Sequence, residues 1–554
     1  RRLAERYKAH PALAMWHINN EYGCHVSECM CDVCAGRFRE WLSARYRTIE
    51  NLNKCWGTAF WSQHYNGWDE ILPPRKAPTY RNPSQQLDYL RFMNESLLDL
   101  CRTEASILRA STPAIPLTTN FMGFFKPLDY VQWAQTLDVV SWDCYPNPAA
   151  HQRPARETWP GYPSHDMNEV LQSACAHDLM RSLKGGQPFI LMEQAPSHVY
   201  FRESNAPKRP GVMRLWSYQA MAHGADGILF FQWRASKAGA EKFQSGMVPH
   251  AGRESRTFHE IATLGRELRG LDAVLGATVA AEVAIVTDWQ SRWAMELDSR
   301  PARLDTVQHL RYSYDLFYHQ NIPVDFVTPE GDWTKYKLVI APALHMLTEK
   351  AAKSIREYVH GGGSFVTSYF SGVVDENDQV WLGGYPALLK DVLGISVEEW
   401  YPYPEKCTIK VPGETKELPC STWAELVRLH GARVSAVFNW DYLAGSPALT
   451  INDYGKGKAL YMATMVEPSW MVWLMSDFLK QLDIRPVLRT PRGVEATVRS
   501  KRGRDFLFLL NHNTKVETVD LGEWKGVDLV SGKALKARVK LAPNGVAILE
   551  QKRP

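Results

Sequence analysis

The sequence predicts an α/β protein in three parts: part of a (β/α)8 TIM barrel, a doubly wound α/β domain and a small C-terminal β-sandwich. Three observations support this prediction. Apolar runs alternate with longer helical stretches up to residue 272, a pattern typical of βα units and a parallel sheet. The alternation breaks around residues 271–278 and then resumes to about residue 486. From residue 487 onward, short alternating strands are separated by turns.

The first domain, residues 1–272, contains five apolar runs that we expect to form strands, at residues 12–19, 115–120, 137–143, 189–193 and 227–233. Helices are expected at residues 86–110 and 212–223. Five strands cannot close an eight-stranded barrel. Either the sheet is open, or only about strands 4–8 are present and three βα units precede residue 1. The second alternative is favoured, because residues 1–7 resemble the tail of an amphipathic helix and the chain does not begin with Met.

The second domain, residues 273–486, is predicted to have strands at residues 283–286 and 338–341 and a helix at residues 349–360. Glycines 361–363 then lead into a third strand. A phosphate-binding loop would follow a strand and open a helix, so this order favours a tight helix-to-strand turn instead. The third domain, residues 487–554, is predicted to be all-β, with strands at residues 495–498, 505–510, 527–529 and 546–549.

Composition excludes several classes of function. The net charge of +4 is spread thinly, without the Lys/Arg blocks of a nucleic-acid-binding protein. No apolar segment approaches the roughly 20 residues of a membrane span. The ten cysteines are not spaced as a disulfide framework, which predicts a reducing, cytoplasmic location. Large cores are the favoured explanation for the many aromatic residues, and platforms for sugar rings are the alternative.

Two glutamates stand at the ends of predicted strands. Glu21 follows the apolar residues 12–16, and Glu193 ends the run at residues 189–193. Barrel enzymes place catalytic side chains at these strand ends. Two carboxylates delivered in this way are what hydrolysis of a glycosidic bond needs, one to protonate the leaving oxygen and one to attack the anomeric carbon or activate water.

Four sequence blocks resemble glycoside hydrolase family 42, the β-galactosidases. They are NNEYG at residues 19–23, WGTAFWSQ at residues 56–63, LMEQAPS at residues 191–197 and HGADGILFFQWR at residues 223–234. The similarity extends over almost the whole chain and includes the order of the three domains. It implies a TIM barrel in which Glu21 follows the fourth strand and Glu193 the seventh, with Glu21 as general acid/base and Glu193 as nucleophile of a retaining mechanism.

The resemblance also implies which residues contact the sugar. Asn20 matches the position that binds the 2-hydroxyl. The positions that line the galactose subsite are matched by Trp61, Tyr145, Phe201, Glu241 and Gln244. The family usually has Trp where Phe201 stands and His where Gln244 stands, so these two departures leave the sugar preference open. Ordinary core packing is the alternative for each aromatic residue.

Three cysteines, Cys29, Cys31 and Cys34, have C-x-C-x-x-C spacing, which lets thiolates converge on one tetrahedral zinc. Some members of the family hold a structural zinc with these three cysteines and a fourth from an upstream loop. Cys24 is a candidate for that fourth ligand, and reduced thiols without metal are the alternative. No cofactor is implied for catalysis.

The second domain resembles the trimer-forming domain of the family, which is similar in fold to class I glutamine amidotransferases. Those enzymes need a Cys nucleophile at a strand-to-helix turn. The only cysteines here, Cys407 and Cys420, lie outside the corresponding run at residues 365–372. Amidotransferase activity is therefore rejected, and a homotrimer is expected.

The resemblance predicts a retaining exo-glycosidase that removes terminal non-reducing β-D-galactose from oligosaccharides or plant-derived galactosides. Three alternatives stay open. The enzyme could be a related exo-glycosidase such as an α-L-arabinopyranosidase. It could be a non-catalytic sugar-binding or assembly protein. The third alternative is an incomplete enzyme, because the first strands of the family supply an Arg and an Asn to the galactose site.

Overall fold

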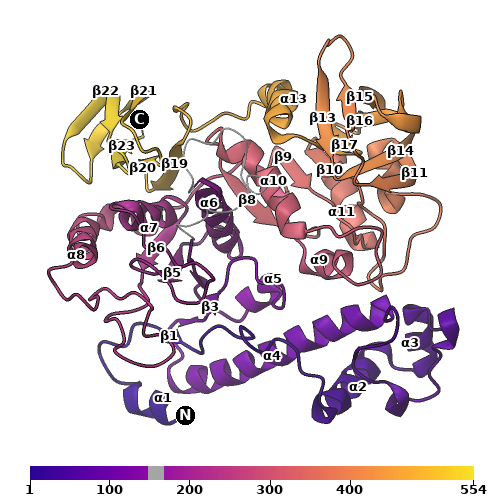
Figure 1. The fold of residues 1–554 in the computed structure, drawn as a ribbon, viewed down its shortest axis with the longest axis horizontal. Helices are drawn as coiled ribbons and strands as arrows, with labels where there is room; N and C mark the ends of the chain where they lie inside the picture. Colours follow the sequence, from indigo (N-terminus) through magenta and orange to yellow (C-terminus); the bar gives the residue numbers. More distant parts are fainter. Residues whose placement is uncertain (147–166, 554) are drawn as a thin grey trace.

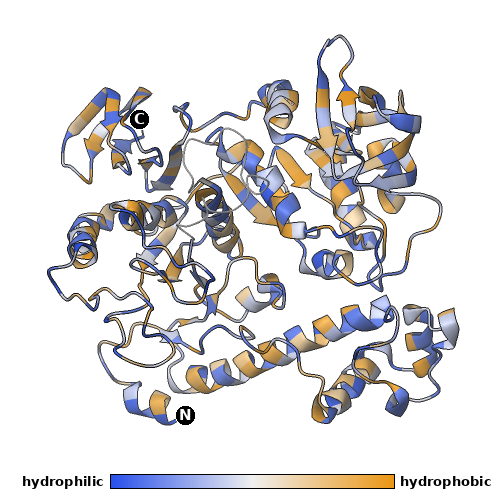
Figure 2. Ribbon diagram, in the orientation of Figure 1, coloured by the Kyte–Doolittle hydropathy of each residue, from blue (hydrophilic) through white to orange (hydrophobic). Residues whose placement is uncertain are grey.

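The computed structural model describes residues 1–146 and 167–553 and shows three units arranged along the chain (Figure 1). The first unit contains the long helix α4 and the parallel strands, the second a large mixed sheet, and the third a small sheet at the C-terminus. Figure 2 shows that the inner strands of the large sheet are largely hydrophobic, whereas hydrophobic and hydrophilic residues alternate along α4. None of the helices in the described part of the chain has the length and apolar character to cross a membrane.

The first unit has five parallel strand positions, at the five places predicted. The strands are β1 Trp16–His17, β2 Leu117–Thr118 with β3 Asn120–Phe121, β4 Ser141–Asp143, β5 Phe189–Glu193 and β6 Ala225–Ile228. β1 pairs with β2, and β3, β4, β5 and β6 pair in that order, always in parallel. The carboxyl ends of all five strands therefore lie at one edge.

Strand β6 ends earlier than the apolar pattern predicts. The expectation of a strand at residues 227–233 is wrong for residues 229–233, which form a loop. Leu229 and Trp233 in this loop are 43% and 70% exposed, so these apolar residues do not indicate a buried strand. Phe231, from the same loop, lines a cavity at the strand ends.

The described part of this unit contains the helices α1 Arg2–Tyr7, α2 Asp32–Tyr46, α3 Ile49–Trp56, α4 Pro83–Ser111, α5 Tyr130–Ala134, α6 Met167–Ser182, α7 Val212–Ala222 and α8 Arg256–Leu268. Helix α4 begins with Pro83 after the cap residue Asn82, whose side chain accepts a hydrogen bond from the N–H of Gln85. Helices α2 and α3 pack against the first half of α4 around Phe38 and Trp56. This small core stands apart from the strands (Figure 1).

The second unit is built on a ten-stranded sheet of two halves. The parallel half runs in the order β17 Gly457–Met462, β10 Ser364–Ser368, β9 Leu338–Ala341, β7 Val283–Val286, β8 Val324–Val327. The antiparallel half adds β16 Pro447–Tyr454, β15 Arg433–Phe438, β12 Thr408–Lys410, β13 Glu417–Ser421 and β18 Met465–Val466. A separate antiparallel pair is formed by β11 Ile395–Pro402 and β14 Trp423–Leu429. The helices are α9 Trp289–Met295, α10 Thr306–Tyr318, α11 Glu349–His360, α12 Lys390–Leu393 and α13 Pro468–Gln481. The predicted doubly wound pattern thus describes only the parallel half.

The glycines between α11 and β10 form a turn between helix and strand, as predicted. Gly362 has φ +118°, and a Cβ on Gly363 would lie 2.3 Å from the ring of Tyr358. Steric reasons therefore favour glycine in this tight turn. Cys407 and Cys420 lie on the hairpin of β12 and β13, away from the end of β10.

The third unit is a single antiparallel sheet in the order β19 Val494–Lys501, β20 Arg504–Asn511, β23 Val546–Lys552, β21 Glu517–Asp528, β22 Ala534–Leu541. The predicted β-sandwich, which needs two packed sheets, is wrong. One face of β20, with Phe506 and Phe508, packs on the first unit together with Met213 and Tyr218 of α7. The other face is buried within the unit, where the long strand β21 pairs with both β22 and β23.

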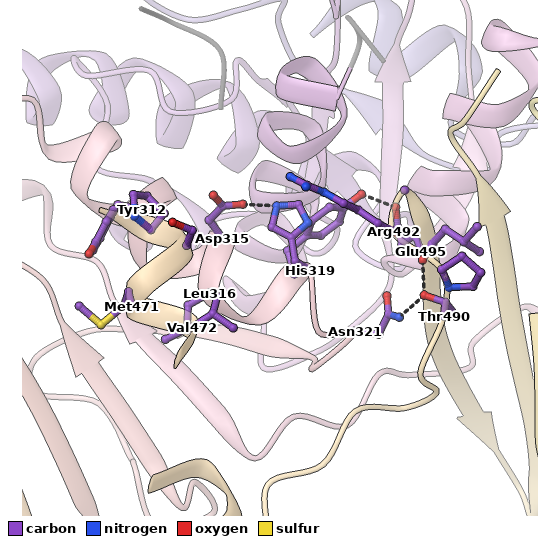
Figure 3. A pocket seen from close by; sticks show the side chains of 16 residues that line it. Tyr312, Asp315, Leu316, His319, Asn321, Met471, Val472, Thr490, Arg492 and Glu495 are labelled. Atoms are coloured by element: carbon purple, nitrogen blue, oxygen red, sulfur yellow. Dashed lines mark hydrogen bonds and ion pairs between the residues drawn. The ribbon is translucent and has the colours of Figure 1, made fainter. Parts of the chain in front are cut away.

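A buried charged cluster joins the three units. His223, which follows α7, contacts Asp178 of α6 through Nδ1 (2.8 Å to Oδ1) and Glu495 of β19 through Nε2 (2.7 Å to Oε1). The hydroxyl of Tyr314, from α10, donates to Asp178 Oδ2 (2.7 Å). Beside this cluster, a cavity of about 390 Å³ lies between α10, α13 and residues 490–495 (Figure 3). His319 Nε2 contacts Asp315 Oδ1 in this cavity (2.6 Å), and none of the predicted site residues lines it.

Candidate active site

Glu21 lies just beyond β1, in a loop fixed by a side chain from the neighbouring strand position. Its backbone has φ 44°, and its N–H donates to Oδ1 of Asn120 in β3 (2.9 Å). The Nδ2 group of Asn120 donates to Oδ1 of Asn20 (3.0 Å) and to Oδ2 of Asp143 (2.5 Å). His17 Nε2 also contacts Asn120 Oδ1 (2.9 Å). Asn120 therefore holds the loop of Glu21 against the end of β4.

Glu193 is the last residue of β5, and its carboxylate points toward the same place. Its Oε2 accepts a hydrogen bond from the hydroxyl of Tyr145 (2.7 Å). Partial burial raises the pKa of Glu193, and the charges of Glu21 and Glu241 raise it further, against the hydrogen bond from Tyr145. Burial also raises the pKa of the Tyr145 hydroxyl strongly, so this group stays protonated and can act only as a donor to the carboxylate.

The two predicted carboxylates meet. One carboxylate oxygen each of Glu21, Asp143 and Glu193 lie within 4.8 Å of one another. A separation of about 5 Å between two carboxyl groups is the geometry of retaining glycosidases, whereas inverting enzymes leave about 6.5–9.5 Å for a water molecule. The arrangement can therefore place a nucleophile and a proton donor on one glycosidic bond.

Asp143, the third carboxyl group, was missed by the sequence reasoning. It ends β4 just as Glu193 ends β5, so the strand-end rule that selected Glu193 applies to it equally. Asn120 was missed for the same reason. An acidic or amide residue at the last position of each predicted strand was the signal that would have found both.

Glu21, Asp143 and Glu193 line a cavity of about 620 Å³ at the strand ends. It is also lined by Asn20, Tyr145, Phe201, Glu241 and Gln244, five of the six predicted sugar-contacting residues. The Phe201 ring is 53% exposed and meets the Tyr145 ring edge-on at 5.7 Å. The Tyr200 hydroxyl donates to Glu241 Oε1 (3.1 Å). Such a mixture of an exposed ring and fixed polar groups suits a sugar.

The cavity also contains a cation that the sequence did not indicate. The guanidinium of Arg202 donates a hydrogen bond to the backbone carbonyl of Tyr145 and lies 5.5 Å from the centre of the Phe201 ring. Arg202 thus braces the loop that carries Tyr145 and the exposed ring.

Trp61 is the one predicted sugar contact that the structure does not bring to the cavity. It lies in the short 3-10 helix Phe60–Ser62, after α3, and is 57% exposed. Its ring packs on that of Phe60 (4.7 Å between centres). Trp61 is not among the described residues that line the cavity, so its contact with the sugar stays a prediction.

The predicted metal ligands do converge. The Sγ atoms of Cys29, Cys31 and Cys34 lie within 4.8 Å of one another at the start of α2. The backbone N–H of Cys34 and the neighbouring thiols lower the pKa of Cys31 to about 7, which favours a thiolate. These three thiols suit three of the four positions of a closed zinc site. Cys24 is not one of this group and lines the active-site cavity, so the expectation that it replaces the fourth ligand is wrong.

Comparison with known proteins gives consistent matches over the whole chain. Family profiles described as "Beta-galactosidase", "Beta-galactosidase trimerisation domain" and "Beta-galactosidase C-terminal domain" match residues 1–271, 281–485 and 493–551. Beta-galactosidase BgaB of Geobacillus sp. is 50% identical over 555 residues, which cover 100% of this chain and 80% of the relative. Beta-galactosidase LacZ of Heyndrickxia coagulans is 49% identical over 552 residues, covering 99% and 80%.

Solved structures agree with these sequence matches. The crystal structure of beta-galactosidase from Bacillus circulans sp. alkalophilus has a TM-score of 0.93 at 42% identity, covering 99% of this chain and 81% of that one. A catalytic mutant of Gan42B, a GH42 beta-galactosidase from G. stearothermophilus, also has a TM-score of 0.93, at 36% identity, covering 100% and 80%.

Proposed function

The chain belongs to glycoside hydrolase family 42, and from this premise we propose which of its residues carry out the reaction. It is a retaining β-galactosidase, which releases terminal non-reducing β-D-galactose, and its first unit is a TIM-barrel catalytic domain. Glu193 is the nucleophile and Glu21 the general acid/base. The observation that carries this assignment is the separation of at most 4.8 Å between their nearest carboxylate oxygens.

Two displacements follow from this geometry. In the first, Glu193 attacks the anomeric carbon while Glu21 gives a proton to the departing oxygen, and a galactosyl ester forms on Glu193. In the second, Glu21 takes a proton from water as the water oxygen attacks the anomeric carbon and the ester bond breaks. The hydroxyl of Tyr145 orients the attacking oxygen of Glu193 by donating to its partner Oε2.

The sugar would be held by residues of the same cavity. Asn20 is assigned to the 2-hydroxyl, where a hydrogen bond strengthens in the transition state. Phe201 offers a ring face, and Glu241 and Gln244 offer polar groups. Their common position around the carboxylates supports this assignment.

Substitution of each glutamate tests the mechanism. We expect Glu193→Ala and Glu21→Gln each to lower kcat on a β-galactoside by at least ~10²-fold, the smallest usual contribution of a positioned acid or nucleophile. Glu254→Gln is the control, because that carboxyl is 96% exposed. NMR of the first product should show the β-anomer. Full activity of either glutamate variant, or an inverted product, contradicts the assignment.

We propose further that the five parallel strands correspond to strands 4–8 of the barrel. Glu21 follows the first of the five positions and Glu193 ends the fourth. This spacing agrees with catalytic glutamates after the fourth and seventh barrel strands. Cross-links designed between neighbouring strand ends in this order would test the assignment, because a different order would leave some of them unformed.

The Cys29, Cys31 and Cys34 thiolates are proposed as ligands of a structural zinc. Such a site holds the start of α2 and leaves no open position for catalysis. Elemental analysis of the purified protein should find one zinc per chain, and Cys34→Ser should lose it. The control is Cys55→Ser, since Cys55 is not one of the three clustered thiols. A protein free of zinc after purification in zinc-containing medium would contradict the proposal.

The homotrimer is a proposal that the match of residues 281–485 to the trimerisation domain supports. Light scattering should give three times the chain mass of 63.1 kDa. A monomeric or dimeric mass would contradict it.

A cytoplasmic location is likewise proposed from the spacing of the ten cysteines. Cell fractionation of a producing strain tests it, and activity in the secreted fraction would contradict it.

A further inference from the structure

Asp143 is a buried acid that the two-glutamate mechanism leaves without a role. It ends β4 and is only 6% exposed. Its Oδ2 accepts a hydrogen bond from Asn120 Nδ2 (2.5 Å). Its Oδ1 is buried without a hydrogen-bond partner of ordinary geometry among the described residues. A carboxylate oxygen of Asp143 lies within 4.8 Å of both Glu21 and Glu193.

Three carboxylates at this separation cannot all be ionised, because like charges repel strongly in a partly buried site. Asp143 is the most buried of the three, whereas Glu21 and Glu193 are half-buried. Burial, followed by the charges of Glu193 and Glu21, raises the pKa of Asp143 to about 10. Among the described residues, the other titratable groups that interact with Asp143 are the thiols of Cys24 and Cys144 and the hydroxyls of Tyr130 and Tyr145, which are neutral at pH 7.

The hydrogen bonds around Asn120 decide which oxygen of Asp143 carries the proton. The Oδ1 of Asn120 accepts from the Glu21 N–H, so its Nδ2 must face Asp143. Oδ2 of Asp143 is therefore an acceptor. The proton belongs on Oδ1, the buried oxygen that otherwise has no partner.

We propose that Asp143 is a positioning residue that stays protonated and donates a hydrogen bond from Oδ1 to the carboxyl group of Glu21. The inference rests on the acid/base role proposed for Glu21. A donor on one oxygen of Glu21 leaves the other oxygen to exchange its proton with the departing sugar oxygen. The end of β4 then supplies a neutral O–H donor to each catalytic carboxyl group, Asp143 to Glu21 and Tyr145 to Glu193.

Two substitutions separate a neutral donor from an ionised carboxylate. In Asp143→Asn the amide has the shape of the neutral acid, since its oxygen can accept from Asn120 and its NH₂ group can donate to Glu21. Asp143→Ala removes the donor. The readout is kcat/KM against pH on two substrates: lactose, whose leaving oxygen needs a proton, and dinitrophenyl β-galactoside, whose leaving group does not.

We expect Asp143→Asn to stay within about tenfold of the unchanged enzyme on both substrates, with the same pH profile. Asp143→Ala should lose about 10²-fold or more on lactose, the scale of a general acid, and much less on the dinitrophenyl substrate. A variant that merely distorted the fold would lose activity on both substrates equally. Loss of lactose hydrolysis by Asp143→Asn to the level of Asp143→Ala would overturn the proposal.

An infrared difference spectrum tests the protonation state directly. At pH 7 the unchanged enzyme minus Asp143→Asn should show the C=O stretching band of a protonated carboxyl group. Absence of this band would overturn the proposal even if one variant folds poorly. The infrared result does not depend on the proposed function. The proposed function fails by a different result, normal hydrolysis of lactose by Glu21→Gln.

Discussion

The catalytic cavity and the junction between the three units each bury several carboxyl groups within reach of one another. In the cavity, one carboxylate oxygen each of Glu21, Asp143 and Glu193 lie within 4.8 Å of one another, and the pKa values of Asp143 and Glu193 are raised by burial and by neighbouring negative charge. At the junction, Asp178 and Glu495 share the ring of His223 between them. Burial raises the pKa of both junction acids, but His223, together with Arg181 at Asp178 and His512 at Glu495, lowers both.

The difference shows what each arrangement is suited to. Burial alone would lower the pKa of His223, yet the two acids raise it to about 10, so the junction keeps its ion pairs across the neutral range. The charges there are matched and contribute to holding three units together. In the cavity, like charges are held together at a cost in stability, and a proton is kept available where a glycosidic bond is broken.

Exchanging one glutamate for glutamine in each region should separate the catalytic role of the cavity from the stabilising role of the junction most strongly. Glu193→Gln should lower kcat by on the order of 10⁴-fold or more, the scale seen when a nucleophile is removed, and leave unfolding nearly unchanged. Glu495→Gln should lower the free energy of unfolding by about 3–5 kcal/mol and leave the kcat of the folded enzyme largely intact. Steady-state kinetics and urea unfolding of both variants check this. Equal effects of the two changes on activity would erase the distinction.

Removing the shared cation tests the junction by itself. His223→Ala leaves Asp178 and Glu495 buried with fewer partners and should cost about 3–5 kcal/mol at pH 7. The contribution of His223 is fully present below its unfolded pKa of about 6.5 and is lost as the pH rises through about 10. The difference between the two proteins in urea unfolding should therefore shrink above pH 10. A constant difference from pH 6 to pH 11 would show that His223 is neutral in the fold.

A tyrosine hydroxyl donates to a carboxylate at 2.7 Å in each region, which offers a matched pair of smaller changes. A hydrogen bond to a charged group contributes about 1.5–3 kcal/mol. Loss of this hydrogen bond in Tyr145→Phe should give a roughly 10–100-fold lower kcat with little change in stability. Tyr314→Phe should instead give lower stability with unchanged kcat. Thermal unfolding and kinetics of both variants decide whether the regions differ in this way.

The sequence predicted those elements whose signal is local. Helix α11 and strands β5, β7 and β9 have their predicted bounds, since a short apolar run or a one-sided helical pattern is sufficient for each. The antiparallel half of the large sheet was missed because its pairings are remote. Strand β13, for example, pairs with β18 more than 40 residues later. The single C-terminal sheet was likewise mistaken for a sandwich, because sheet number depends on β21 pairing with two partners.

The candidate site was predictable to the extent that strand ends and motifs fix side chains. Glu21 and Glu193 meet as expected, because parallel strands bring their carboxyl ends to one edge. Trp61 lies outside the described lining of the cavity, because a motif gives the identity of a loop residue and not the direction of the loop. The protonated state of Asp143 could not be predicted, because it depends on distances to two acids from other strands.

The last comparison concerns the free energy of unfolding that is linked to binding of a proton. Asp143 has a folded pKa of about 10 against about 3.9 unfolded, so the unfolded chain releases a proton above pH 4 that the folded chain retains. Stability therefore falls as the pH rises between these values. Asp143→Asn lacks this loss and should therefore be more stable than the unchanged protein at pH 8, with little difference at pH 4.

Asp178→Asn is the matched control from the junction, with the opposite sign. In the unchanged protein, His223 and Arg181 lower the pKa of Asp178 against the effect of burial. The contribution of Asp178 to stability is therefore present above its unfolded pKa and is lost as the pH falls. Asp178→Asn should therefore be less stable than the unchanged protein at pH 8, by an amount that decreases toward pH 4. Urea unfolding of both variants at the two pH values gives four differences. If the two aspartates gave differences of the same sign at pH 8, the contrast between like charges in the cavity and paired charges at the junction would be wrong.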